Sequence, residues 1–354
     1  MKQNFSTLDG MRGIAAIFVL ISHTGLYWNG LIFKHTHLAV DMFFVLSGFV
    51  IGYAYEHKLT SGALTYKEFI VIRLIRLYPM YFISVFFATT VAVLGYVSSE
   101  HQNAGYLKDL IISTSLTFLF LPSFIANSIN LFPLNGAYWS IFYELVVNFS
   151  YAILKPILNK KVLITILLIF AGLLCLIVYL NGTLGAGFTW RYTSIATAIT
   201  RSGFGIFLGV HLNRIGKNYW PNFVPSAWLI LSLMSLVLML PNLGALDGVV
   251  DLFAVFIIFP FCVVFGAMCK PSQVTNSIFK VLGQSSYPLY LLHVPISVLL
   301  YSLLGQTINQ HAPLSGIFLV LGLILFTILL ERLYDLPVRK YLGNRYLKRI
   351  NKSY

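Results

Sequence analysis

The chain has 354 residues, of which 58% are hydrophobic and only 10% are charged. Apolar runs of membrane-spanning length recur from one end to the other, so the composition excludes a soluble domain and indicates a polytopic membrane protein. The formal net charge of +13 comes from basic residues spread over short loops and the end of the chain. This spread favours membrane topology over nucleic-acid binding as its cause. The three cysteines lie in separate apolar runs without metal-ligand spacing, so we expect neither a disulfide framework nor a metal site.

Ten hydrophobic segments are long enough to cross a bilayer, and they cover residues 11–28, 38–55, 77–97, 138–156, 162–180, 192–211, 225–241, 250–269, 285–304 and 314–333. An eleventh apolar stretch, 110–125, is shorter and contains Pro122. If this stretch dips into the membrane and returns, nearly all Lys and Arg fall on one side with both termini, as the positive-inside rule requires. The sequence therefore predicts an all-α bundle of about ten transmembrane helices with a re-entrant or interfacial segment at 110–125. We expect one membrane domain over 1–342 and a basic cytoplasmic tail over 343–354.

Arg12 and His23 are the polar side chains that stand out in the first segment. They are eleven residues apart, and at about 100° per residue they lie within about 20° of each other on one helix face. A rise of ~1.5 Å per residue places His23 about 16 Å deeper than Arg12. Ionisable groups inside a membrane helix are costly and often functional, although a structural histidine is the alternative.

The second segment carries Asp41 near its outer end and Ser47 in its middle. Because a short loop makes the first two segments antiparallel, Asp41 can approach the depth of His23, where a carboxylate would fix the imidazole tautomer. The alternative is that Asp41 is an interfacial residue at a helix end. On the preferred topology, Glu144 of the fourth segment lies in the same layer and is a second candidate to orient His23.

Arg73 and Arg76 are three residues apart on one helical face, just before the third membrane segment. Together with Arg12 they could bind the phosphates of a nucleotide-like donor such as coenzyme A. Membrane anchoring or contact with lipid headgroups is the alternative. Further polar side chains in the apolar segments are candidates for lining a substrate cavity, with structural roles equally open: Ser47, Trp139, Arg201 and His293.

Six motifs, in order, resemble the acyltransferase family 3 of bacterial integral-membrane O-acyltransferases, in its stand-alone form. They read LDGMRGIAAIFVLISH, VDMFFVLSGFVIG, RLIRLYPMY, AYWSIFYEL, SSYPLYLLH and DLPVRKYL, and they cover residue 8 to about residue 342. The resemblance implies transfer of an acyl group, commonly acetyl from acetyl-coenzyme A, to a hydroxyl of a cell-surface glycan or related molecule. It matches Arg12 and His23 to the family's signature pair, Arg73 and Arg76 to its Arg-x-x-Arg, and Glu144 to its fourth-span Glu.

Residues and resemblance together give one mechanistic hypothesis. Acetyl-coenzyme A, the acyl donor, is held from the cytoplasm by Arg12, Arg73 and Arg76. His23, oriented by Asp41 or Glu144, acts as general base on the acceptor hydroxyl or first takes the acyl group itself.

We expect a multi-pass protein of the bacterial inner membrane with both termini cytoplasmic. Its expected partners are an acyl-coenzyme A donor, a polysaccharide or lipid-linked glycan acceptor and membrane lipids, with no nucleic acid and no metal. A succinyl donor stays open. Two other classes stay open as well: a secondary transporter that uses the ionisable residues as a relay, and a glycan-export accessory protein that performs no chemistry.

Overall fold

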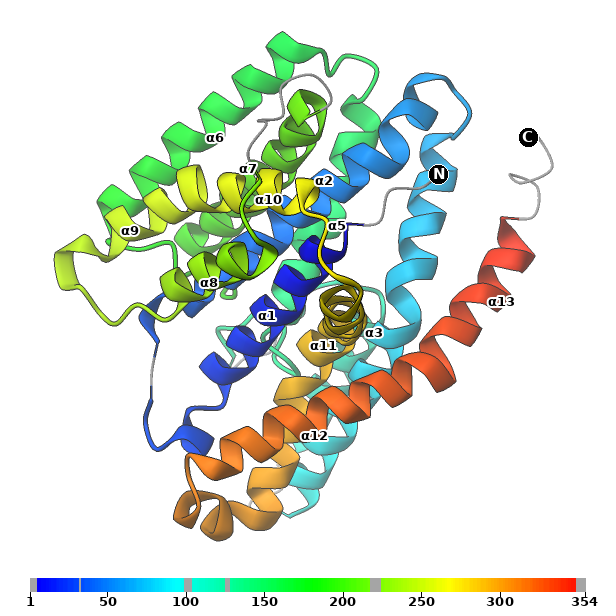
Figure 1. The fold of residues 1–354 in the computed structure, drawn as a ribbon. Coiled ribbons are helices and arrows are strands. Elements are labelled where there is room, and N and C mark those ends of the chain that lie inside the picture. The colour runs from blue at the N-terminus through cyan, green and yellow to red at the C-terminus, as the bar shows by residue number, and fades with distance from the viewer. Residues whose placement is uncertain (1–4, 32, 99–103, 125–127, 217–223, 348–354) are drawn as a thin grey trace.

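The computed structural model describes the chain except residues 1–4, 32, 99–103, 125–127, 217–223 and 348–354. The described residues form an all-α structure, in which the only strand-like pairing is an isolated bridge between Asn130 and Thr189. The α-helices are α1 (Ser6–His23), α2 (Ala39–Thr60), α3 (Tyr66–Val97), α4 (Ala104–Phe118), α5 (Tyr138–Leu154), α6 (Lys160–Asn181), α7 (Tyr192–Gly216), α8 (Ala227–Leu238), α9 (Asp247–Phe253), α10 (Phe259–Met268), α11 (Gln273–Gln310), α12 (Leu314–Leu330) and α13 (Leu336–Tyr346) (Figure 1). Short 3-10 or π turns are η1 (Gly25–Trp28), η2 (Lys34–Leu38), η3 (Gly244–Leu246), η4 (Ala254–Ile258) and η5 (Glu331–Asp335).

Each of the ten predicted segments contains a helix, and the molecule is a polytopic membrane helix bundle. Within the described residues, seven helical stretches are long and apolar enough to cross a bilayer. The other three predicted segments hold α1, α5 and α8, which have 18, 17 and 12 residues. At ~1.5 Å per residue, α8 is only about 18 Å long, so it does not by itself cover a hydrocarbon core of ~30 Å.

The described part of the stretch 110–125, residues 110–124, is helical up to Phe118 and then turns, and its helix lies along the second half of α3. α4 runs antiparallel to α3: the rings of Tyr96 and Tyr106 stack with centroids 5.5 Å apart, and the Tyr81 hydroxyl donates to the Thr117 carbonyl at 2.9 Å. α5 continues along the first half of α3, starting where the hydroxyls of Ser84 and Tyr138 lie 2.7 Å apart. The predicted fourth span is thus a 17-residue helix, about half as long as the 32-residue α3, and it follows α4 along that helix.

Two helix pairs form the centre of the bundle, α1 against α11 and α2 against α7. Both depend on glycine at the crossing, because a Cβ on Gly13 would overlap the Leu282 side chain and one on Gly48 would overlap the Ile206 carbonyl. Small residues let membrane helices approach closely enough for backbone contact. These two crossings fix the positions of His23 and Ser47, which lie on α1 and α2.

The last helices form one continuous rod, since α12 passes through the π turn η5 into α13. The stretch Leu314–Tyr346 has 33 residues, about 50 Å at the helical rise, and α13 projects beyond the bundle in Figure 1. The domain boundary expected at residue 342 falls inside α13, so the structure shows no break there. Residues 348–354 of the expected tail lie outside the described residues.

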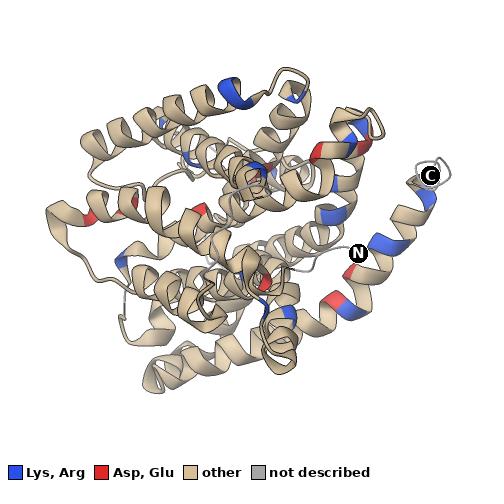
Figure 2. Cartoon of the chain, turned by 45° about the horizontal axis from the view of Figure 1, so that its top comes forward, with Lys and Arg blue, Asp and Glu red and all other residues tan. Residues whose placement is uncertain are grey.

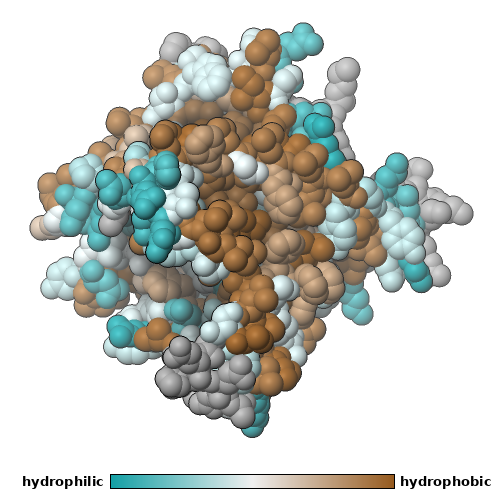
Figure 3. Space-filling view, turned by 90° about the horizontal axis from the view of Figure 1, so that it is seen from below, coloured by the Kyte–Doolittle hydropathy of each residue, from teal (hydrophilic) through white to brown (hydrophobic). Residues whose placement is uncertain are grey.

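Charge and hydropathy divide the surface as expected for a bundle in lipid. Figure 2 shows long helices with few charged positions, while blue and red positions recur along α13 and near helix ends. The face in Figure 3 is broadly apolar, with hydrophilic groups toward its margins. A membrane protein exposes such apolar faces because lipid, rather than water, is its solvent.

Candidate functional site

A pocket of about 390 Å³ opens where the start of α1 meets α3, α5, α11 and the junction of η5 with α13. This volume lies within the range of small-molecule sites. Its charged lining comes from five helices far apart in sequence: Asp9, Arg12, Arg73, Arg76, Glu144, Lys280, Glu331, Asp335 and Arg339. The three arginines expected to act together therefore line one pocket.

Three of the pocket's five cations are paired with carboxylates. Arg12 pairs with Asp9 at 2.5 Å, Arg73 with Glu144 at 2.7 Å, and Arg339 with Asp335 at 2.7 Å.

The pairing leaves donor capacity unused. The buried Nε atoms of Arg12, Arg73 and Arg339 have no hydrogen-bond partner. Arg76 and Lys280 make no ion pair within the described part of the chain. Five cations against four carboxylates make this an anion-attracting site whose guanidinium groups can exchange a carboxylate for a phosphate.

Glu144 lies with these arginines and not with His23, contrary to the expectation that it shares the layer of the histidine. Its Oε1 accepts from Arg73 at 2.7 Å and from the hydroxyl of Ser47 at 2.6 Å. The reason is the short α5, which carries Glu144 down the first half of α3 toward Arg73. Ser47, expected to contact substrate, lines the same pocket.

His23 is the last residue of α1, exposed at the helix end, and its partner is a second histidine. Its Nδ1 lies 3.0 Å from Nε2 of His293 on α11, and the two rings stack with centroids 5.1 Å apart. The prediction that a carboxylate orients His23 is therefore wrong, because neither Asp41 nor Glu144 contacts His23. The helix pair α1–α11 decides the partner, because it turns this face of α1 toward α11.

Tyr290 connects the pocket to the histidine pair. Its ring lines the pocket together with Phe43, whose centroid is 5.5 Å away. On its other side the same ring lies 6.0 Å from the ring of His293. Tyr290 therefore belongs to the pocket lining and also neighbours His293, so it joins the pocket to the histidine pair.

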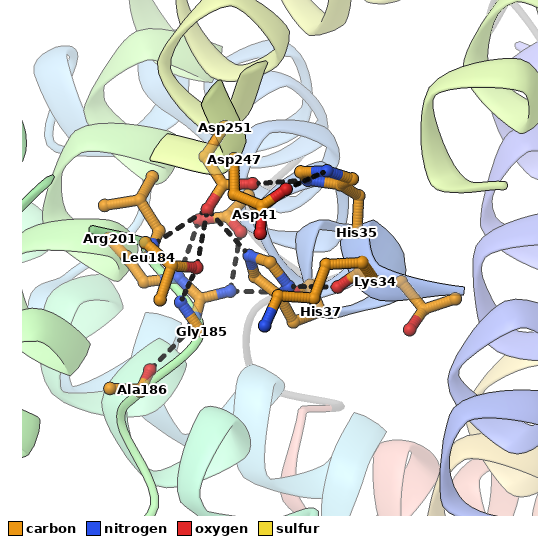
Figure 4. Close-up of polar contacts among 12 residues, drawn as sticks. Lys34, His35, His37, Asp41, Leu184, Gly185, Ala186, Arg201, Asp247 and Asp251 are labelled. Atoms are coloured by element: carbon orange, nitrogen blue, oxygen red, sulfur yellow. Dashed lines mark hydrogen bonds and ion pairs between the residues drawn. The ribbon is translucent and has the colours of Figure 1, made fainter. Parts of the chain in front are cut away.

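Asp41 and Arg201 form a buried ion pair away from the pocket (Figure 4). Arg201 donates to both carboxylate oxygens of Asp41, at 3.0 and 2.6 Å, and also to the carbonyls of His37 and Ala186. Its guanidinium lies 5.4 Å from the ring centroid of Trp139. These contacts link α2, α7 and α5, while the catalytic role expected for Asp41 and the substrate contacts expected for Arg201 and Trp139 stay predictions.

A second buried polar cluster, which the sequence reasoning missed, lies next to this pair (Figure 4). Asp251 of α9 accepts from His35 at 2.8 Å, from His37 at 3.1 Å, from the Thr183 hydroxyl at 2.9 Å and from the Leu184 backbone at 2.8 Å. The cluster joins η2, α9 and the loop after α6. Its one sequence signal is the His-x-His of residues 35–37, which lies outside the predicted apolar helix cores.

The pocket also contains charged residues to which no role was given, among them Asp9, Lys280, Asp335 and Arg339. Their signal lies in the motifs, since Asp9 and Arg12 are an i, i+3 pair and Asp335 and Arg339 an i, i+4 pair. Residues at these spacings are neighbours on a helix. Only the fold shows that both pairs face one pocket.

The fold and the site define a polytopic membrane protein with a cationic pocket at one end of α1 and, at the other, a histidine pair of which His293 is buried. The acyltransferase 3 family model, described as an acyltransferase domain, matches residues 5–332. The chain belongs to this family and is a membrane acyltransferase. It is similar to "Protein 2 in picA locus" of Rhizobium radiobacter, with 38% identity over 158 residues that cover 42% of this chain and 82% of the relative. No solved structure matches the chain.

Proposed function

We propose that this acyltransferase is an O-acyltransferase of the bacterial inner membrane that takes acetyl from acetyl-coenzyme A on the cytoplasmic side. The acceptor is a hydroxyl of a cell-surface polysaccharide, a lipid-linked glycan or a related molecule. The observation that carries the proposal is the gathering of Arg12, Arg73 and Arg76 in one pocket, whose lining residue Tyr290 neighbours the pair of His23 and His293.

The donor fits the pocket by charge. Coenzyme A carries several phosphate charges at one end and a flexible thioester arm at the other. Planar guanidinium groups bind phosphate bidentately, and the unpartnered Nε atoms of Arg12 and Arg73 add donors to those engaged with carboxylates. The thioester arm then points along α1 toward Phe43 and Tyr290, where the lining is aromatic.

The chemistry needs one base. Nε2 of His23 removes the proton from the acceptor hydroxyl, and the oxygen attacks the thioester carbonyl carbon. The C–S bond breaks, and the proton returns from His23 to the leaving thiolate as coenzyme A departs. In the covalent variant, the imidazole nitrogen takes the acyl group first and passes it to the hydroxyl. A peptide carrying acyl-His23, trapped by acid quenching and identified by mass spectrometry, marks the covalent route.

The test is mass spectrometry of cell-surface glycans and lipid-linked intermediates from cells with the wild-type protein, with His23→Ala and without the gene. We expect an acetyl or succinyl increment with the wild type alone, because loss of a general base costs on the order of 10²- to 10⁴-fold in rate. The amount of folded protein in the membrane is the control. Unchanged acylation with folded His23→Ala would remove His23 from the mechanism.

A secondary transporter was the alternative class that the ionisable residues left open in the sequence. If all three samples carry identical acylation, counterflow of labelled substrate in proteoliposomes is the next assay. The family match to acyltransferases weighs against that class.

A further inference from the structure

His293 is a buried histidine whose two ring nitrogens have different kinds of partner. Its side chain is 0% exposed. Nδ1 lies 2.8 Å from the Tyr290 carbonyl and 3.2 Å from the Leu289 carbonyl, while Nε2 lies 3.0 Å from Nδ1 of His23. In the described chain His293 makes no ion pair with a carboxylate.

These contacts determine where the hydrogens lie. A carbonyl oxygen only accepts, so Nδ1 of His293 carries the hydrogen. In the neutral ring Nε2 is then an acceptor, and Nδ1 of His23 must donate to it. The Val19 carbonyl, one turn earlier on α1, is a second hydrogen-bond partner of the His23 ring. With its hydrogen on Nδ1, His23 has an unprotonated Nε2, which is the atom a general base needs.

We propose that His293 is a positioning residue that holds His23 in the tautomer with a free Nε2 lone pair. The inference rests on the proposed function, because it assumes that His23 is the reacting base. His293 takes the place that a carboxylate fills in the familiar acid–histidine pair, and it does so as a neutral acceptor. With both rings neutral, the pair gains a charge only when His23 takes the substrate proton.

The part of α11 around His293 is fixed relative to α1 by contacts on both sides. Pro295 has no backbone N–H, so the Leu291 carbonyl four residues earlier loses its helical donor. The Ser84 hydroxyl and the Asn135 amide donate to that carbonyl instead, at 2.7 and 2.9 Å. On the His23 side, the Tyr27 hydroxyl donates to the Ser297 carbonyl at 2.6 Å, which ties the turn after α1 to the next turn of α11.

Two amide substitutions at His293, which are equally polar, distinguish a positioning role from a purely structural role of the buried side chain. In His293→Gln the side-chain oxygen reaches the place of Nε2 and can accept from His23. In His293→Asn the shorter amide reaches only the place of Nδ1. We expect His293→Gln to keep kcat within about tenfold and His293→Asn to lose on the order of 10²-fold or more, both with an unchanged KM for acetyl-coenzyme A.

The control is His211→Gln on α7, which removes a histidine remote from the site. A purely structural role for His293 would lower the yield of both variants alike and leave kcat per folded molecule similar. Equal loss of kcat in the Gln and Asn variants would overturn the proposal.

A direct readout is the nitrogen NMR spectrum of protein labelled at its histidine rings. The signals of the His23 ring are assigned by their absence from the spectrum of His23→Gln. We expect the hydrogen on Nδ1 in the wild type and in His293→Gln, and a shift toward Nε2–H in His293→Asn. A wild-type Nε2–H would overturn the positioning role even where His23→Ala abolishes transfer. A wild-type Nδ1–H with full transfer by His23→Ala would instead overturn the proposed function, and the positioning role in catalysis with it.

Discussion

At the residue scale, Glu144 forms an ion pair with Arg73, whose guanidinium group the proposed donor needs for its phosphate. Its carboxylate pairs with Arg73 at 2.7 Å, with side chains 20% and 7% exposed. A bound phosphate must displace this carboxylate or share the arginine with it. Glu144 thus competes with the donor for Arg73, and the Ser47 hydroxyl donates to the Glu144 carboxylate.

Glu144→Gln should therefore strengthen binding of coenzyme A. The pair is largely buried, so removing the Glu144 charge leaves the Arg73 guanidinium without its counter-charge, and we expect the Kd to fall at least severalfold in calorimetry with purified protein at low salt. The control is Glu68→Gln, which makes the same charge change in the capping box at the start of α3, where Gln also fits. Unchanged or weaker binding together with lost transfer would assign Glu144 to the reaction itself.

Asp41 and Arg201 show how a residue's surroundings decide its partner. A carboxylate near a helix end and an arginine inside an apolar segment are both candidate site residues in the sequence, since each is costly alone in a membrane. The structure pairs them across 160 residues of chain. That pairing depends on the crossing of α2 and α7, which hydropathy does not encode.

At the element scale, the crossing of α2 and α7 places Ser47 and Phe44 against the pocket. Gly48 of α2 lies against the Ile206 carbonyl, with no room for a side chain between the two backbones. Gly52 lies one turn later on the same helix, where a Cβ would be 3.4 Å from the nearest atom, Cβ of Asn213. Two glycines of one helix are thus in very different situations.

Gly48→Ala should destabilise the protein, whereas Gly52→Ala should be tolerated. The added methyl group at Gly48 forces the two helices apart, and overpacking of this kind costs typically 1–3 kcal/mol. Thermal unfolding in detergent, monitored by size-exclusion chromatography, should show a lower midpoint temperature of unfolding for Gly48→Ala but not for Gly52→Ala. Equal midpoints for both variants would mean that the α2–α7 contact is looser than the structure shows.

The hydropathy pattern predicted the helices well, because apolar length is a local property of the sequence. Each of the ten predicted segments contains a helix. The pattern could not show that α4 and α5 follow one another along α3, since that arrangement depends on contacts such as Tyr81 with Thr117. The motifs correctly predicted that Arg12, Arg73 and Arg76 lie together. They could not show that His23 contacts His293, because this partner lies 270 residues away in the chain.

At the scale of the whole molecule, the pocket and the histidine pair lie at opposite ends of α1. Arg12 lines the pocket, and His23 ends the helix eleven residues later, a rise of about 16 Å. Coenzyme A does not cross membranes, so in the proposed function the pocket end faces the cytoplasm. The positive-inside rule places the basic α13, which borders the same pocket, on that side as well.

This orientation can be measured with single cysteines in a background where Cys175, Cys262 and Cys269 are replaced by Ala. Arg345→Cys lies exposed on α13 at the pocket end, and Leu31→Cys lies exposed beyond the other end of α1. In intact spheroplasts a membrane-impermeant maleimide should label Leu31→Cys at once and Arg345→Cys only after the membrane is disrupted. Retained glycan acylation shows that each variant is native. The reverse labelling pattern would place the arginine pocket outside, where no acetyl-coenzyme A is available, and the proposed donor would fall with it.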